Sequence, residues 1–292
     1  MDVTALERLY QGFLLSKEAD GLKETTLKMY YCMYRSLVEH LSHTKLQDAT
    51  TITPQDLQRW VLYLKDQKHY ANATRDQRIA KCKSFFKWCC DNGFLAEDPA
   101  RSLKRPKQNW QPDPLSEDEL YMLLQESTKG RCGVRNYAVI CFLLDSGVRN
   151  SELRNLKADD ISLKTGQVKI REGKGSKPRT VIIGKRAKEA LWRWMMHRPE
   201  ETEYLFCTEN GRKIRRTVLR RIVSVIGDKV GVRAYPHRLR HTFALQYLKL
   251  GGDPYSLQYL LGHEDMTVTK HYVKIAAQDA TEMYRSPLDA LG

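Results

Sequence analysis

This 292-residue chain lacks any apolar run near the roughly 18 residues that a membrane-spanning helix needs. Its first residues, MDVTALERLY, do not resemble a secretory signal peptide. Its seven cysteines lack C-x-x-C pairs and fall mostly within apolar helical patterns. We therefore expect reduced thiols in a cytoplasmic protein, with no membrane association. Internal repeats and low-complexity tracts are absent as well, which argues against a repeat protein.

Acidic residues are fewer than basic ones, and this imbalance indicates the partner. The 49 Lys and Arg residues exceed the 35 Asp and Glu residues, so the formal net charge is +14 and the pI about 9.4. Such a charge suits a polyanion, either a nucleic acid or an anionic membrane surface. Because membrane signals are missing, we favour nucleic acid.

The first third of the sequence has the spacing of helices. Apolar residues recur at helical intervals in TTLKMYYCMYRSLVEHL, and Thr53 can cap a second helix that has Pro54 at its first position. A third helix is expected over 72–91. Lys83 and Lys87 lie on its polar side, where they form either a solvated face or phosphate contacts.

A linker separates this helical part from the rest of the chain. DPARSLKRPKQNWQPDP carries four prolines and a basic cluster, and Ser116 then begins a capping box with Glu119. Further on, GQVKIREGKGSKPRTVII alternates as a β-hairpin does. We predict a mainly α fold with a small β-hairpin or sheet (α+β), and three segments, namely a helical domain over 1–103, a linker over 104–114 and a second domain over 115–292.

The string YPHRLRHTF places His237 and Arg240 on one helical face. An arginine fork and an imidazole suit a phosphate, because the guanidinium binds two oxygens while histidine transfers a proton. His237 and His241 also have a zinc-like spacing, but the glutamate of a zinc protease motif is absent and Arg238 and Arg240 would repel a cation. We therefore expect no metal site and a structural role for His241.

Two further basic positions are ambiguous by themselves. Arg149 follows a tight turn in LLDSGVRNSELRNL, where an ion pair with Glu152 would explain it. Lys174 lies at the hairpin tip, where an exposed turn lysine is the simpler explanation. The neighbouring Lys177 and Arg179 are equally suited to that explanation or to DNA contact.

Taken in order, these motifs resemble those of the tyrosine recombinases, the lambda-integrase and Xer-like family. SGVRNSEL, GKGSKPRTV, HRLRH, LLGH and a tyrosine nine residues beyond that last histidine follow one another as in the family, and the resemblance covers nearly the whole chain. It implies a core-binding domain and a catalytic domain that clamp DNA. It implies six catalytic residues and one supporting acid: Arg149, Lys174, His237, Arg240, His263, Tyr272 as nucleophile, and Glu152 in support. Apart from the resemblance, we expect five basic residues to contact DNA, namely Lys83, Lys87, Lys177, Arg179 and Arg238.

The resemblance also implies the reaction and the partners. Tyr272 would form a 3′-phosphotyrosine and release a 5′-hydroxyl, with Lys174 as general acid and no metal, ATP or other cofactor. Four protomers would act on two duplexes with inverted-repeat half-sites through a Holliday junction, and the protein would otherwise be a monomer or dimer, with accessory proteins a further option. The departures, Asn150 after the first arginine and the residues flanking the tyrosine in TKHYVKI, concern the subtype.

Alternatives remain at this point. A type IB topoisomerase uses the same chemistry, but we would not expect it to carry this helical N-terminal part. A DNA-binding protein of the same fold without catalysis is disfavoured because all six reacting groups are present. Among the other tyrosines, Tyr255 and Tyr259 have the spacing of core or interface packing residues, and Tyr284 lies beyond the motif. The early start of the helices indicates a simple two-domain enzyme, such as a resolvase or a compact integrase.

Overall fold

The computed structural model describes residues 3–42, 51–107, 111–171 and 178–277, and these divide into two compact units, Met1–Trp110 and Gln111–Gly292. Each unit has its own hydrophobic core. In the described residues, no helix is both long and apolar enough to cross a membrane.

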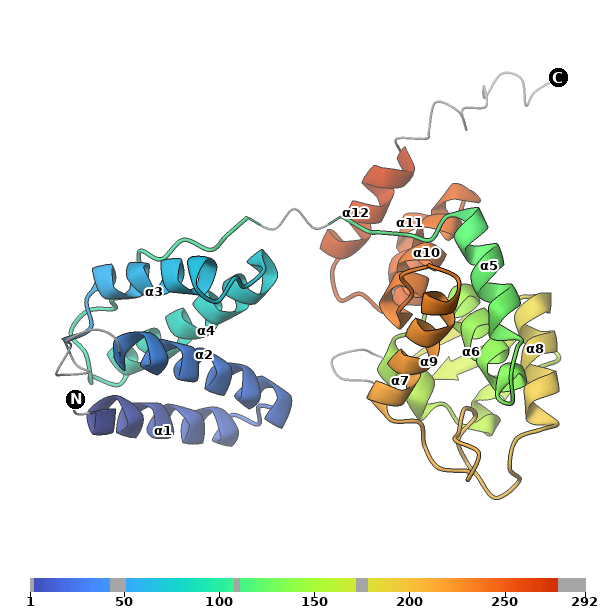
Figure 1. The fold of residues 1–292 in the computed structure, drawn as a ribbon, viewed down its shortest axis with the longest axis horizontal. Helices are drawn as coiled ribbons and strands as arrows, with labels where there is room; N and C mark the ends of the chain where they lie inside the picture. The colour runs from blue at the N-terminus through green and yellow to red at the C-terminus, as the bar shows by residue number, and fades with distance from the viewer. Residues whose placement is uncertain (1–2, 43–50, 108–110, 172–177, 278–292) are drawn as a thin grey trace. The chain divides into compact units, whose positions relative to one another are not determined.

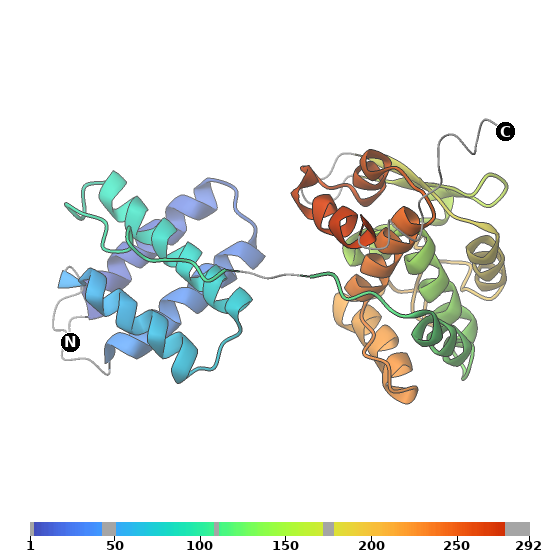
Figure 2. The same cartoon turned by 90° about the horizontal axis from the view of Figure 1, so that it is seen from above.

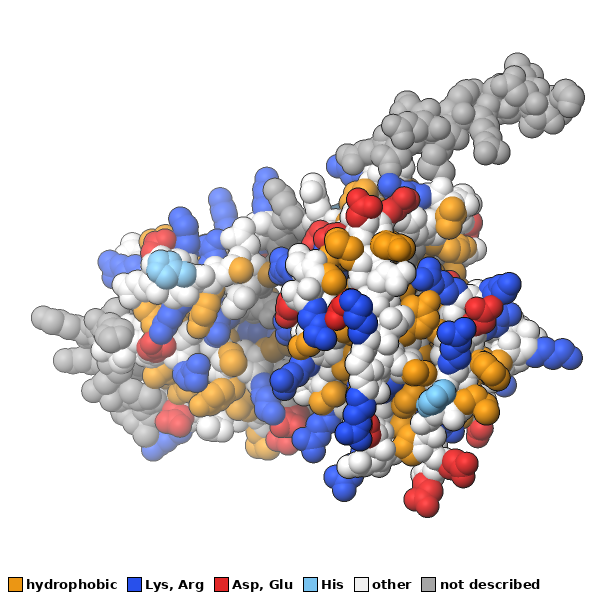
Figure 3. Space-filling model, turned by 45° about the vertical axis from the view of Figure 1, so that its right-hand side comes forward, with side chains coloured by type: hydrophobic (Ala, Val, Ile, Leu, Met, Phe, Trp, Pro, Cys, Tyr) orange, Lys and Arg blue, Asp and Glu red, His pale blue; other side chains and the backbone are white. Residues whose placement is uncertain are grey.

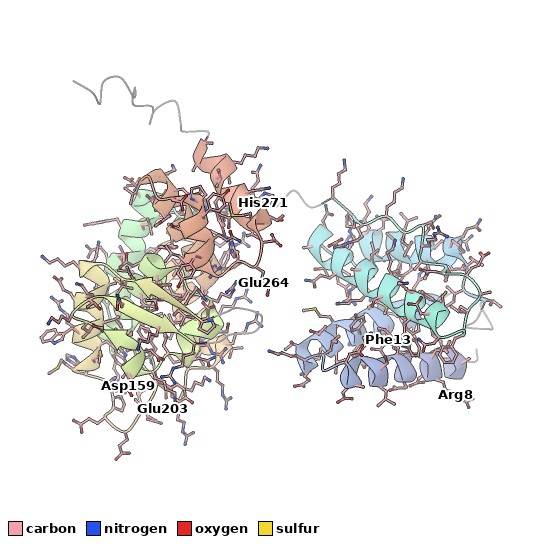
Figure 4. The ribbon with its side chains drawn as sticks, turned by 180° about the vertical axis from the view of Figure 1, so that it is seen from behind. Arg8, Phe13, Asp159, Glu203, Glu264 and His271 are labelled. Atoms are coloured by element: carbon pink, nitrogen blue, oxygen red, sulfur yellow. The ribbon has the colours of Figure 1, made fainter. Side chains whose placement is uncertain are left out.

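The described residues of the first unit form the helices α1 (Val3–Ala19), α2 (Glu24–Ser42), α3 (Pro54–Asp66) and α4 (Asn72–Asp91), which Figure 1 shows. Aromatic side chains form much of its core, and Phe13 of α1 contacts the rings of Tyr30, Phe85 and Trp88 edge-on. Phe13 is fully buried and lies within the helical unit in Figure 4. Such pairs add specific geometry to the burial of apolar area.

The second unit places helices around a small sheet, as Figures 1 and 2 show. Its helices are α5 (Glu117–Ser127), α6 (Gly133–Ser146), α7 (Asn150–Asn155), α8 (Lys185–Met195), α9 (Arg216–Lys229), α10 (Pro236–Lys249), α11 (Pro254–Leu261) and α12 (Met266–Ala276), with a 3-10 turn η2 (Ala158–Asp160). Helix α6 is buried along most of its length and packs on α5, α8 and α10. It therefore forms the centre of this unit.

The sheet is antiparallel, with strand order β1 (Ile161–Ser162), β2 (Gln167–Ile170), β3 (Arg179–Ile182). In its register, Val168 pairs with Val181 and Ile170 with Arg179. Alternate residues of both strands are buried, because successive side chains of a strand point to opposite faces. The expected mainly α fold with a small sheet is thus confirmed.

Local signals in the sequence account for where several helices begin. Thr53 and Ser116 each cap a helix in a reciprocal capping box, with Pro54 at the first position of α3. Helix α4 spans the residues that were expected for it.

All seven cysteines are free thiols, and four of them are buried: Cys82, Cys89, Cys141 and Cys207. Burial raises the pKa of the Cys141 thiol to about 11, so this group behaves as a small apolar side chain.

Candidate active site

Three arginines converge on the C-terminal end of α11. The last carbonyls there belong to consecutive residues, Leu260, Leu261 and Gly262. They accept hydrogen bonds from Arg179, Arg240 and Arg149, in that order, at 2.7, 2.8 and 2.5 Å. The end of a helix exposes unpaired carbonyls and a partial negative charge, so it stabilises guanidinium groups brought close together. Arg149 is the N-cap of α7, Arg179 lies on β3 and Arg240 on α10, three positions that are far apart in the sequence.

Two glycines shape the backbone at this point. Gly147 and Gly262 end α6 and α11 with φ of 59° and 64°, the left-handed region that favours glycine. The Gly147 carbonyl accepts a hydrogen bond from Arg240 at 2.8 Å. A Cβ at Gly262 would lie 2.8 Å from Arg179 Nη1 and 3.1 Å from Arg149 Nη1. The arginines therefore pack against a backbone that has no room for a side chain.

Glu152 is the negative centre of this cluster. Its carboxylate accepts two hydrogen bonds from Arg179, at 2.9 and 2.8 Å, and one from Arg149 Nη1 at 3.0 Å. The backbone N–H of Arg149 donates to it at 2.7 Å. Burial by itself would raise the pKa of Glu152, but the hydrogen bonds and charges of Arg179 and Arg149 lower it to about 2. The carboxylate is therefore ionised at neutral pH and orients both arginines.

The structure contradicts the prediction that Arg179 contacts DNA. Only 5% of the residue is exposed, and its guanidinium is bound to Glu152 and to the end of α11. The strand period could have shown this, because Arg179 shares its parity with the inward-facing Val181.

Arg240 and His263 are joined directly. Arg240 Nη2 lies 3.0 Å from His263 Nε2, and His263 Nδ1 lies 3.0 Å from Thr269 Oγ1. Since guanidinium can only donate, Nε2 accepts, and Nδ1 carries the proton that is shared with Thr269. Burial and the charge of Arg240 lower the pKa of His263 to about 4, so its ring is neutral at neutral pH. Burial and the charge of Arg149 also lower the pKa of Arg240, although an arginine stays charged in proteins.

His237 is exposed in the first turn of α10, whereas Arg240 is 2% exposed on the same helix. Partial loss of water lowers the pKa of His237, and the charges of Arg240 and Arg149 lower it further. The two arginines are therefore close enough to act on this histidine electrostatically, and the ring is predominantly neutral at neutral pH.

Tyr272 lies on α12, which packs on α10 and α11. The side chain is 1% exposed, and it lies in an apolar cluster that includes Leu245, Leu257 and Leu261. His241 Nδ1 is 2.6 Å from the Tyr272 hydroxyl. Burial raises the pKa of Tyr272 to about 12, an effect that the charge of Arg240 partly offsets. His241 is buried, as a structural residue should be, but its contact with this hydroxyl was not foreseen.

The net charge of this site is positive. Three arginines and one carboxylate give 3 − 1 = +2, and the histidines are neutral there. Such a centre can bind a phosphodiester and stabilise the extra negative charge of a five-coordinate phosphorus. Arg149, whose side chain is 35% exposed, is the guanidinium that faces solvent.

Other predicted DNA contacts have different outcomes. Arg238 is 7% exposed and donates to Glu119 at 3.0 and 3.1 Å, which contradicts a DNA-contact role. Lys83 Nζ donates to the carbonyls of Arg101 and Leu103 at 2.9 and 3.0 Å, so it binds the chain that follows α4.

Lys87 remains exposed on the same helix and pairs with Asp91 at 3.1 Å. In Figure 3, lysine and arginine side chains are spread over the visible face among hydrophobic and acidic ones. Lys174, Lys177 and Tyr284 lie outside the described residues.

Tyr255 and Tyr259 are not core residues. They are 71% and 56% exposed, and they line a surface groove of about 910 Å³ next to Ile182 and Leu250. The Tyr259 hydroxyl accepts a hydrogen bond from the Thr180 N–H at 3.3 Å. Across the part of the chain that the structure describes, no group of three or more His, Cys, Asp or Glu residues could hold a metal ion.

Comparison with known proteins identifies the family of this chain. The phage integrase family model matches residues 114–279, and the model of the SAM-like N-terminal domain of phage integrases matches residues 9–94. Tyrosine recombinase XerD of Oceanobacillus iheyensis is 31% identical over 280 residues, which cover 91% of this chain and 93% of that protein. Tyrosine recombinase XerC of Proteus mirabilis is 28% identical over 270 residues, covering 90% of this chain and 87% of that protein.

The fold is also that of a solved integrase. The Tn1549 transposon integrase in complex with transposon right end DNA aligns with a TM-score of 0.80 at 18% identity, covering 94% of this chain and 98% of that one. The Xer relatives favour site-specific recombination over relaxation by a topoisomerase. The chain belongs to the phage integrase family and is a site-specific tyrosine recombinase.

Proposed function

We propose that this protein cleaves and rejoins double-stranded DNA with Tyr272 as its nucleophile. The observation that carries the proposal is the convergence of Arg149, Arg240 and His263 at the end of α11, next to the helix that holds this tyrosine. Arg149 binds the scissile phosphate from the solvent side, and Arg240 stabilises the charge that develops on its oxygens. Glu152 holds Arg149 in place.

The chemical step exchanges one phosphodiester for another. The Tyr272 oxygen bonds to phosphorus while the bond from phosphorus to the 5′-oxygen breaks. His237, exposed beside the arginines, accepts the tyrosine proton, and Lys174 protonates the departing 5′-oxygen. The product is a 3′-phosphotyrosine, which a 5′-hydroxyl of the partner duplex attacks in reverse. The number of phosphodiester-type bonds is conserved, so the reaction needs no ATP.

The two units have different tasks in this proposal. The helical part over 1–103 is the core-binding domain, 104–114 is the linker, and 115–292 is the catalytic domain. The net charge of +14 supports binding to duplex DNA, since lysines and arginines displace condensed counterions. We further propose inverted-repeat half-sites and a tetramer at synapsis. The solved Tn1549 integrase complex with transposon DNA supports the DNA-binding part.

Covalent trapping on nicked duplexes tests this function. A nick next to the cleavage position lets the short fragment diffuse away, so each cleavage leaves one protein–DNA adduct. A library of duplexes with short inverted repeats would supply the target, and adducts would be counted after denaturation. We expect adducts with the unsubstituted protein and none with Tyr272→Phe, while DNA binding persists. The control Tyr259→Phe removes an exposed hydroxyl of the neighbouring helix and should leave adduct formation unchanged. Adducts that survive in Tyr272→Phe would refute the nucleophile assignment.

A further inference from the structure

The hydroxyl of Tyr272 cannot meet a DNA phosphate where it lies. The residue is 1% exposed, and its ring is enclosed by the apolar cluster of α10 and α11. The guanidinium that faces solvent is that of Arg149, so a phosphate arrives on the exposed side of the arginine cluster. The nucleophile therefore has to move before it attacks.

His241 is the side chain that a hydrogen bond joins to this hydroxyl in the resting position. Its Nδ1 lies 2.6 Å from the tyrosine oxygen, and it follows Arg240 directly on α10. The His241 ring also lies against that of His237, with ring centroids 4.5 Å apart. Helix α10 carries both the phosphate-binding Arg240 and His241. The same helix therefore holds the nucleophile in its resting position and binds the phosphate that the nucleophile attacks.

Proton affinities show which role the histidine can have. Burial, and to a smaller extent electrostatic coupling to His237 and Arg240, lowers the pKa of His241 to about 3, while burial raises the pKa of Tyr272 to about 12. The two pKa shifts have opposite directions, and both disfavour transfer of the tyrosine proton to His241. His241 is therefore no general base in this state. With either tautomer of the neutral ring, the phenol keeps its proton.

We propose that His241 is a positioning residue, which holds the protonated Tyr272 hydroxyl in a withdrawn resting position through Nδ1. The hydrogen bond is broken when α12 releases the tyrosine toward the phosphate. No covalent bond is made or broken in this step, and only hydrogen-bond partners exchange. The inference rests on the proposed function of Tyr272 and adds a control on when the nucleophile is available.

Two amide substitutions of His241 distinguish a positioning role from a role in packing alone. Asparagine places a polar atom near the position of Nδ1, whereas the longer glutamine places it nearer that of Nε2. A typical intramolecular hydrogen bond contributes roughly 1 kcal/mol, which is about fivefold in a rate or an equilibrium. In single-turnover cleavage of a nicked duplex at saturating DNA, we therefore expect His241→Gln to form adducts about fivefold faster. His241→Asn should stay within about twofold of the unsubstituted protein.

A second measurement needs no DNA. N-acetylimidazole acetylates accessible tyrosine hydroxyls, and peptide mass spectrometry reports each site separately. Acetylation of Tyr272 should rise about fivefold in His241→Gln and remain low in His241→Asn, while the exposed Tyr259 serves as internal reference. His271→Gln, an exposed change beside the nucleophile (Figure 4), should alter neither readout.

Slower cleavage by His241→Gln at unchanged DNA affinity would overturn the proposal, because His241 would then assist the attack itself. Equal rates and equal acetylation in both amide variants would overturn it as well. If His241→Gln does not fold, His241→Leu removes the same hydrogen bond in its place, with the same expected increases. If the unsubstituted protein forms no adducts at all, the proposed function fails, whereas the acetylation of Tyr272 still decides whether His241 holds it.

Discussion

Replacing Glu152 with glutamine should destabilise the second unit strongly and in a pH-dependent way. The pKa of this carboxyl falls from 4.5 to about 2 on folding, a difference of about 2.5 units. At roughly 1.36 kcal/mol per unit, the ionised carboxylate contributes about 3 kcal/mol to the free energy of unfolding at pH 7. The group is almost fully buried, so solvent screens this contribution little. Glu152→Gln removes this contribution of about 3 kcal/mol and leaves the buried Arg179 without its charge partner.

The sign of the pH dependence follows from the lowered pKa. A carboxyl whose pKa falls on folding stabilises the protein fully above about pH 4.5, and this contribution is lost as the pH falls toward 2. About 2 kcal/mol of it should be lost between pH 7 and pH 3, by the same linkage relation. The difference between the unsubstituted protein and Glu152→Gln should therefore be large at pH 7 and much smaller at pH 3.

Urea denaturation followed by tryptophan fluorescence measures this difference. The two units have separate cores and tryptophans in each, so two transitions are fitted and only that of the second unit should shift. Glu189→Gln, an exposed change on α8, is the matched control and should stay within about 0.5 kcal/mol. A loss below about 1 kcal/mol in Glu152→Gln, or a gap that does not narrow at low pH, would refute the account of this cluster.

Four further substitutions test other parts of the structure. Gly262→Ala should lower the cleavage rate at least tenfold and destabilise the protein. The new Cβ would meet two guanidinium groups, and the backbone φ of 64° is strained for a residue other than glycine. Near-normal adduct formation would contradict this prediction. Arg238→Met should reduce the free energy of unfolding by about 2 kcal/mol in urea, since it removes the charge-assisted hydrogen bonds to Glu119, yet leave the DNA affinity of the folded protein unchanged in a gel-shift titration. Lys83→Met should lower the free energy of unfolding of the first unit by about 1 kcal/mol, because two hydrogen bonds are lost. Lys87→Met should instead lower the affinity for DNA and the salt dependence of that affinity. The reverse pattern would show that the two lysines have each other's role.

Local patterns in the sequence were sufficient for much of the fold. Capping boxes, apolar periodicity and the alternation of the hairpin depend on neighbours within a few residues, so α3, α4, α5 and the sheet were predictable. The order of the motifs was sufficient to identify the family, because the spacing of the motifs indicates which residues are the reacting groups. Strand parity also marked Arg179 as inward-facing, although its positive charge suggested DNA contact.

Other properties depend on contacts between residues far apart in the chain. Arg179 lies 27 residues from Glu152, and His241 lies 31 residues from Tyr272, so no local pattern reveals either pair. Only the packing of α10, α11 and α12 decides that Arg240 meets the end of α11 and that the tyrosine is buried. Residue types and their order therefore determine which chemistry the chain carries. The tertiary structure decides which charged groups are buried and paired, because burial and distance set both the pKa values and the accessibility of the nucleophile.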